Sequence, residues 1–103
     1  MYEIKILPKA QDDLKEIRNW YLGEFGEKSA NKVVEKILNS ISVLEIFPDS
    51  GSLTPNNYLN DKGYRMVICE KFISVYKHID KKVYIYHIAN SDKDYTRIIK
   101  NEE

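Results

Sequence analysis

The sequence predicts an α+β domain in which an antiparallel helical hairpin packs against an antiparallel β-sheet. Two observations carry this prediction. Residues 8–46 have helical periodicity that is interrupted only near Gly26, and three short strand-like segments follow between residues 64 and 89. A chain of 103 residues suits one domain with a single modest core, so we expect residues 1–103 to form one domain.

The first element is a strand over residues 2–7, where YEIKIL alternates along the chain. Pro8 ends this strand and suits the first turn of a helix, where a missing N–H costs nothing. Gly26 is a typical helix stop. The helix between them carries apolar side chains at steps of three and four residues: Ala10, Leu14, Ile17, Tyr21 and Phe25.

A second helix follows almost at once, and the short connection makes the two helices antiparallel. Pro48 and the residues Asp-Ser-Gly after it end this helix. Residues 49–63 are rich in Gly, Pro, Asn and Ser and show no period, which predicts a long loop. The apolar stripe of the second helix comprises Ala30, Val33, Val34, Ile37, Leu38, Ile41 and Leu44.

Three strands are predicted over residues 64–70, 71–79 and 82–89, and residues 94–100 have room for one or two helical turns. Two-residue turns between the strands would place Arg65 opposite Tyr76, Tyr76 opposite Ile85, and Ser74 opposite His87. We expect the more apolar face to carry the helices, although one bulge would exchange part of the assignment. That face holds Tyr64, Met66, Ile68, Ile73, Val75, Tyr84, Tyr86 and Ile88.

Composition excludes several classes of protein. The single cysteine, Cys69, allows neither an internal disulfide nor a multi-cysteine zinc site, which favours a reducing compartment such as the cytoplasm. No apolar stretch approaches the roughly 18 residues that span a membrane, and the N-terminus does not read as a signal peptide. We therefore expect a soluble cytoplasmic protein without a cofactor or a metal.

Charge is unevenly distributed although the net charge is zero. Residues 1–64 carry eight Lys/Arg and ten Asp/Glu, whereas residues 65–100 carry eight Lys/Arg and four Asp/Glu. The basic half could face an anionic partner, such as RNA or an acidic protein segment, or could be an ordinary solvated surface.

Polar groups gather on the second face of the predicted sheet and at its exit, IYHIANSDKDY (residues 85–95). Arg65 could clamp a phosphate but is more often an ion-pair partner at a surface. His87 could transfer protons but is more often a packing residue in a strand. Tyr76 is expected to pack within the sheet. Phosphate-binding glycine loops, HExxH-type metal motifs and nucleophile elbows do not occur in this sequence.

Nearly the whole chain resembles the RelE/ParE superfamily, the toxins of type II toxin–antitoxin modules. The matching skeleton in the first half is Ala10, Asp13-Leu14, Ile17, Tyr21, Gly26, Ala30, a hydrophobic helix to Leu44, Pro48 and Gly51. The second half, GYRMVICEKFISVYKHIDKKVYIYHIANSDKDY, is similar to the family's Gly-Tyr-Arg start and its last strands.

This resemblance implies a growth-inhibiting toxin that a cognate antitoxin neutralises. RelE-like members cut mRNA on the ribosome, and ParE-like members poison DNA gyrase. The long helical hairpin and the FPDSG ending resemble ParE more than compact RelE. We therefore favour a gyrase inhibitor, with a ribosome-dependent mRNA endonuclease and a decayed toxin that only binds antitoxin as alternatives.

The corner after the last strand departs from the pattern of the RNA-cleaving relatives. Where these often read His-Gly-Arg-Arg-Asp, this chain has Asn90, Ser91, Asp92, Lys93 and Asp94. The asparagine removes a proton carrier, and Asp92 would repel a polyanionic substrate. Arg65 matches an arginine of the family. If the chain is a ribonuclease, we expect a rearranged catalytic set in which His87, Lys93 and Tyr95 act near Arg65. For partner binding we expect Arg65, Tyr76, Lys77 and Asn90.

Overall fold

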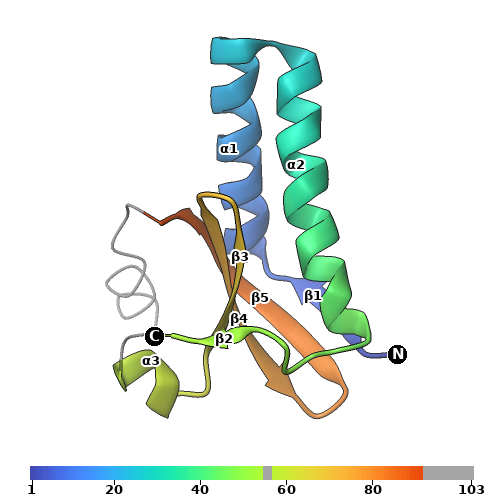
Figure 1. Ribbon diagram of the computed structural model, residues 1–103, viewed down its shortest axis with the longest axis vertical. Helices are drawn as coiled ribbons and strands as arrows, with labels where there is room; N and C mark the ends of the chain where they lie inside the picture. Colours follow the sequence, from blue (N-terminus) through green and yellow to red (C-terminus); the bar gives the residue numbers. More distant parts are fainter. Residues whose placement is uncertain (55–56, 92–103) are drawn as a thin grey trace.

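The computed structural model describes residues 1–54 and 57–91. It confirms the predicted order of a strand, a helical hairpin and three further strands (Figure 1). The predicted helical turns over residues 94–100 lie outside the described residues, as do residues 55–56. The elements are β1 (Glu3–Ile6), α1 (Pro8–Phe25), α2 (Glu27–Ser42), the 3₁₀ turn η1 (Val43–Glu45), β2 (Ser52–Leu53), α3 (Asn57–Asp61), β3 (Arg65–Cys69), β4 (Phe72–Ile79) and β5 (Lys82–Asn90).

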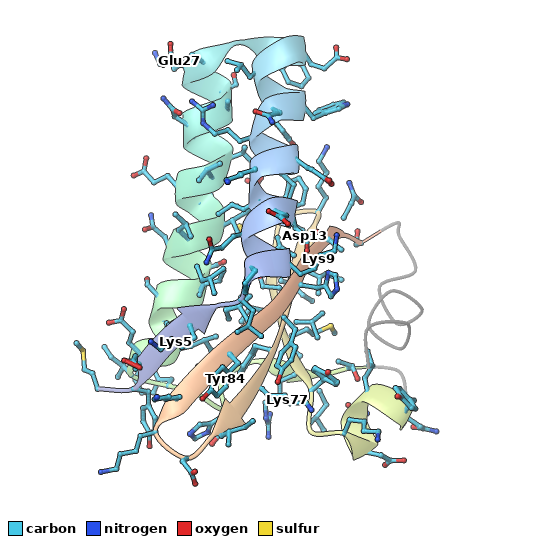
Figure 2. The ribbon with its side chains drawn as sticks, turned by 180° about the vertical axis from the view of Figure 1, so that it is seen from behind. Lys5, Lys9, Asp13, Glu27, Lys77 and Tyr84 are labelled. Carbon is cyan, nitrogen blue, oxygen red and sulfur yellow. The ribbon has the colours of Figure 1, made fainter. Side chains whose placement is uncertain are left out.

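A single glycine joins the two long helices. The N–H of Gly26 donates to the carbonyl of Leu22 at 3.1 Å and closes α1, while its own carbonyl accepts the N–H of Ala30 at 3.1 Å and opens α2. Gly26 has a φ of +91°, which side chains with a Cβ rarely adopt. The hairpin projects beyond the sheet, and Glu27 marks its far end (Figures 1 and 2). In the described part of the chain, none of the helices is long and apolar enough to cross a membrane.

The five strands form one sheet in the order β1-β5-β4-β3-β2. The pairs β5–β4, β4–β3 and β3–β2 are antiparallel, whereas β1 pairs with β5 in parallel. The parallel pair is the one part of the sheet that a tight turn cannot connect, and the helical hairpin lies in the chain between its two strands.

The register is as predicted at one end of the sheet and shifted at the other. Arg65 pairs with Tyr76, and Tyr76 with Ile85, as expected. The predicted pairing of Ser74 with His87 is wrong, because His87 pairs with Val75. β5 contains one extra residue at this point, Tyr86, and such a bulge moves every later side chain of the strand to the other face.

The helices cover the face of the sheet that the sequence pattern left for solvent. The core beneath them contains Ala10, Val33, Ile37, Ile41 and Leu44 from the helical segments and Phe72, Tyr76, Val83, Ile85 and Ile88 from the strands. Of the residues predicted to face the helices, only Ile88 does so, and the bulge brings it there. The remaining difference arises because both faces are apolar, so hydrophobicity alone could not choose between them.

The opposite face has a smaller core of its own. Leu59 of α3 is fully buried there against Tyr64, Ile73 and Val75. The segment predicted as a loop over residues 49–63 therefore holds two short elements, β2 and α3. These form because β3 offers an edge to residues 52–53 and the sheet offers an apolar surface to Leu59.

Alanine substitutions of the two glycines near the hairpin tip, Gly23 and Gly26, should have opposite effects on stability. Gly26→Ala should lower the free energy of unfolding by about 1–3 kcal/mol, because alanine is strained at a φ of +91°. Gly23→Ala lies inside α1 with no atom within 4 Å of the added Cβ, so it should raise stability by about 0.5–1 kcal/mol. Urea unfolding of both variants checks this, and equal effects would contradict the role assigned to Gly26.

Candidate functional site

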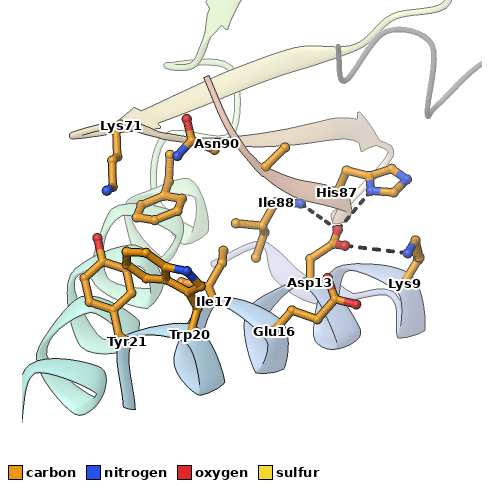
Figure 3. A pocket seen from close by; sticks show the side chains of 12 residues that line it. Lys9, Asp13, Glu16, Ile17, Trp20, Tyr21, Lys71, His87, Ile88 and Asn90 are labelled. Carbon is orange, nitrogen blue, oxygen red and sulfur yellow. Dashed lines mark hydrogen bonds and ion pairs between the residues drawn. The ribbon is translucent and has the colours of Figure 1, made fainter. Parts of the chain in front are cut away.

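A cavity of about 460 Å³ lies between α1 and the ends of β4 and β5 that face it (Figure 3). Its volume falls within the roughly 300–1,000 Å³ of typical ligand sites. Figure 3 shows Lys9, Asp13 and His87 at one end and the rings of Trp20 and Tyr21 with Lys71 at the other. The lining residues are Lys9, Asp13, Glu16, Ile17, Trp20, Tyr21, Lys71, Phe72, His87, Ile88, Ala89 and Asn90.

Asp13 fixes α1 to the edge of β5. The pairing of β1 with β5 ends at Ile6 and Ile85, so the outer edge of β5 would otherwise be open beyond that point. Beyond that point the Asp13 carboxylate binds the edge of β5. Its Oδ2 accepts the Ile88 N–H at 3.1 Å and the His87 Nδ1–H at 2.9 Å. A side chain on the helix thus satisfies a backbone group that a neighbouring strand would normally bind.

These contacts determine the protonation of the pair. A carboxylate can only accept, so Nδ1 of His87 carries the proton of the bond. Burial raises the pKa of the Asp13 carboxyl, but the hydrogen bonds from His87 and Ile88, together with the nearby charges of His87 and Lys9, outweigh it and hold the pKa below its usual value. Asp13 is therefore ionised at neutral pH, and Lys9 lies 3.7 Å from its Oδ1.

The other end of the cavity holds a lysine among aromatic rings. The Lys71 Nζ lies 5.6 Å from the ring centroid of Trp20, 5.5 Å from that of Tyr21 and 5.8 Å from that of Phe72. The Tyr21 and Trp20 rings meet edge to face at 5.2 Å. A cation within about 6 Å of a ring face is attracted by the ring quadrupole, so three rings hold this ammonium in place.

Arg65 and Tyr76, both predicted to bind a partner, hold the segment 48–51 onto the sheet. The Tyr76 hydroxyl accepts the Gly51 N–H at 3.0 Å and donates to the Pro48 carbonyl at 2.8 Å, and burial raises its pKa. The Arg65 Nη1 donates to the carbonyls of Gly51 at 3.0 Å and Asp49 at 3.3 Å. A Cβ on Gly51 would lie 2.5 Å from the Tyr76 hydroxyl oxygen, so only glycine fits there.

The structure does not bring Arg65 and His87 together. Arg65 contacts the backbone of the segment 48–51, whereas His87 contacts Asp13 of α1 at the outer edge of β5. His87 is also only 2% exposed. Lys93 and Tyr95, the other two residues of the expected catalytic set, lie outside the described residues. The catalytic set remains a prediction.

The two remaining candidates for partner binding lie in different places. Asn90 lines the cavity beside α1. Lys77 lies on β4, with its Nζ 4.3 Å from the ring centroid of Tyr64 and 5.5 Å from that of Tyr86 (Figure 2). These rings belong to the sheet face opposite the helices. The expected binding residues therefore do not form one continuous surface.

Sequence reasoning missed the importance of Asp13, Trp20 and Lys71. Asp13 belongs to the Asp-Leu pair that resembles the family, but it lies off the apolar stripe of the first helix, a position typical of solvated residues. Trp20 also lies beside this stripe in the sequence, a position that favours packing at the edge of the stripe. Lys71 carries little local signal, because two of the three rings around it, those of Trp20 and Tyr21, come from a helix about 50 residues earlier in the chain. Among residues 1–54 and 57–91, groups of three or more His, Cys, Asp or Glu that could hold a metal ion do not occur.

Asp13→Asn should make the stability of the protein less sensitive to acid. Because the folded pKa of Asp13 lies below the ordinary value of 3.8, its stabilising effect is present above pH 3.8 and is lost as the pH falls through the folded pKa. We expect the variant to lose about 1–2 kcal/mol at pH 7 and to approach the wild type in acid. Denaturant unfolding from pH 7 down to below pH 3.8 measures this difference in the free energy of unfolding. The variant Asp12→Asn, at the exposed neighbouring residue, is the control. A constant difference at every pH would show that the charge is unimportant.

Tyr76→Phe should lower the free energy of unfolding by about 1–3 kcal/mol, because the Gly51 N–H and the Pro48 carbonyl lose their hydrogen-bond partner. Tyr84→Phe is the matched control on β5, since the described residues give its hydroxyl no hydrogen bond. Urea unfolding should separate the two variants, and equal stabilities would argue against the Tyr76 anchor.

The chain matches the sequence model of a family described as "ParE toxin of type II toxin-antitoxin system, parDE" over residues 4–95. Among solved structures it is similar to the chromosomal ParDE TA system from P. aeruginosa, with a TM-score of 0.75 and 25% identity over 87% of this chain and 96% of that chain. A more distant similarity is to the toxin–antitoxin complex RelBE2 from Mycobacterium tuberculosis, with a TM-score of 0.48 and 14% identity over 86% of this chain and 96% of that chain. A comparison with curated proteins returns no match.

The family match covers most of the chain, from residue 4 within β1 to residue 95, and includes both long helices and the strands β2 to β5. It also includes Asp13, Gly51, Arg65 and Tyr76, the residues that anchor α1 and the segment 48–51. The chain belongs to the ParE toxins of type II toxin–antitoxin systems, within the RelE/ParE superfamily.

Proposed function

We propose that this toxin inhibits growth by binding DNA gyrase and that a cognate antitoxin neutralises it by binding the toxin directly. The proposal rests on membership of the ParE family together with the placement of Arg65 and His87. A gyrase inhibitor needs a binding surface, whereas an RNA-cleaving toxin needs a base, an acid and cations around one phosphate.

The placement of Arg65 is the observation that carries this choice. Its guanidinium donates to two carbonyls of the segment 48–51, and its Nε lies 3.9 Å from the Asp49 carboxylate. These contacts direct the guanidinium toward protein groups of its own chain. His87 is likewise occupied by Asp13 and is buried. Both side chains thus form contacts that stabilise the fold, which favours a toxin that acts by binding.

Purified toxin should block the supercoiling activity of DNA gyrase and increase the amount of cleaved DNA that gyrase holds. Adding the antitoxin encoded by the neighbouring reading frame before gyrase should restore supercoiling. Unchanged supercoiling at toxin concentrations that stop growth in cells would refute the gyrase target. Harmless expression of the toxin without its antitoxin would instead support a decayed toxin.

A translation-coupled assay of mRNA cleavage tests the ribonuclease alternative. We expect no cleavage by the wild-type toxin. If cleavage does occur, the double variant Arg65→Ala, His87→Ala decides whether the expected catalytic set is used. Loss of cleavage in a double variant that circular dichroism shows to be folded would support that set, and cleavage at the wild-type rate would exclude it.

A further inference from the structure

The two lysines of the cavity beside α1 have different surroundings. Lys9 lies 3.7 Å from the Asp13 carboxylate and is thereby neutralised. Lys71 has its ammonium over the rings of Trp20, Tyr21 and Phe72, and within residues 1–54 and 57–91 it forms no ion pair. Aromatic rings attract a cation without neutralising its charge. Lys71 therefore presents a held positive charge to an incoming anion.

The aromatic wall next to Lys71 is open to solvent. Trp20 is 52% exposed and Phe25 is 62% exposed, and their rings lie 5.8 Å apart in an edge-to-face arrangement. Large exposed aromatic side chains with few rotatable bonds are typical of protein interfaces, because covering them is favourable and costs little conformational entropy. Trp20 and Lys71 both line the cavity, so an exposed aromatic surface and a cation lie side by side there.

We propose that this cavity receives a segment of the cognate antitoxin in which an acidic side chain lies next to a large apolar side chain. The carboxylate pairs with Lys71, and the apolar side chain packs against Trp20 and the floor formed by Ile17 and Ile88. The proposal deepens the proposed function, since it takes the neutralising antitoxin as the occupant. The site is already formed without the partner, because the aromatic rings position Lys71 and because Asp13 fixes α1 against β5. Binding therefore requires little rearrangement.

The charges of the cavity favour a peptide over a nucleic acid. Asp13 and Glu16 line the same cavity as Lys71 and Lys9, which makes its formal charge zero. A nucleic-acid backbone carries one phosphate per nucleotide, so the phosphate after the one at Lys71 would approach these carboxylates. A peptide with one carboxylate beside an apolar side chain avoids this repulsion and still covers the aromatic wall.

Trp20 is the only tryptophan of the chain, so its indole N–H gives one assignable NMR signal in the wall of the cavity. We expect acetyl-Leu-Glu-Leu-amide to shift this signal saturably and to bind about fivefold more tightly than acetyl-Leu-Gln-Leu-amide, which removes only the charge. Lys71→Gln should abolish this difference. Lys62→Gln is the matched control and should preserve it, because the Lys62 ammonium lies over the Tyr58 ring, 5.7 Å from its centroid, outside the cavity.

Equal binding of the two peptides, or no shift of the Trp20 signal, would overturn the chemistry assigned to the cavity. The occupant is tested separately with the antitoxin encoded by the neighbouring reading frame. Lys71→Gln should raise the Kd of the toxin–antitoxin complex about fivefold, and Lys62→Gln should leave it unchanged. An unchanged Kd for Lys71→Gln would overturn the antitoxin as occupant. Failure of the proposed function would look different: the wild-type toxin would bind no antitoxin or would not inhibit gyrase, while the peptide preference would persist.

Discussion

The hydrogen bonds that Asp13 accepts from His87 and from the backbone of Ile88 are the contacts on which the arrangement of helix and sheet depends. β1 is too short to cover the whole outer edge of β5, and one carboxylate from α1 completes the cover. This contact brings the N-terminal half of α1 against the strand. It thereby creates the cavity that runs from Lys9 to Trp20, so the same residue that protects a strand edge also shapes the candidate site.

A second set of contacts works in the same way at the other end of the sheet. Tyr76 and Arg65 bind the backbone of the segment 48–51, and Gly51 lets that segment approach the tyrosine ring. Arg65 and Tyr76, whose side chains could serve catalysis, thus attach the segment 48–51 to the sheet. In this chain Arg65 and Tyr76 are therefore occupied by groups of their own protein.

The two ends of the cavity differ in how their charges are compensated. Near Asp13 the charges are paired at short range and their effect on the surroundings is small. Near Trp20 the positive charge of Lys71 faces aromatic rings, which hold it without cancelling it. Lys71 belongs to the excess of lysine and arginine after residue 64, and it lies on the aromatic side of the cavity, where we propose that it pairs with a carboxylate of the antitoxin.

The sequence by itself determined the α+β class, the order of the first strand, the helical hairpin and the last three strands, and the limits of the first helix, because these depend on local periodicity and on Pro8 and Gly26. The second helix ends at Ser42, ahead of Pro48, and β2 and α3 lie where the sequence predicts a loop. The sequence also indicated the RelE/ParE resemblance. Only the tertiary structure decided which face of the sheet the helices cover, because both faces are apolar and no sequence signal marks the bulge at Tyr86. The same holds for the candidate site. Asp13 and His87 are 74 positions apart, and nothing in either local sequence specifies their contact. Such a contact arises from packing, which a one-dimensional pattern does not encode.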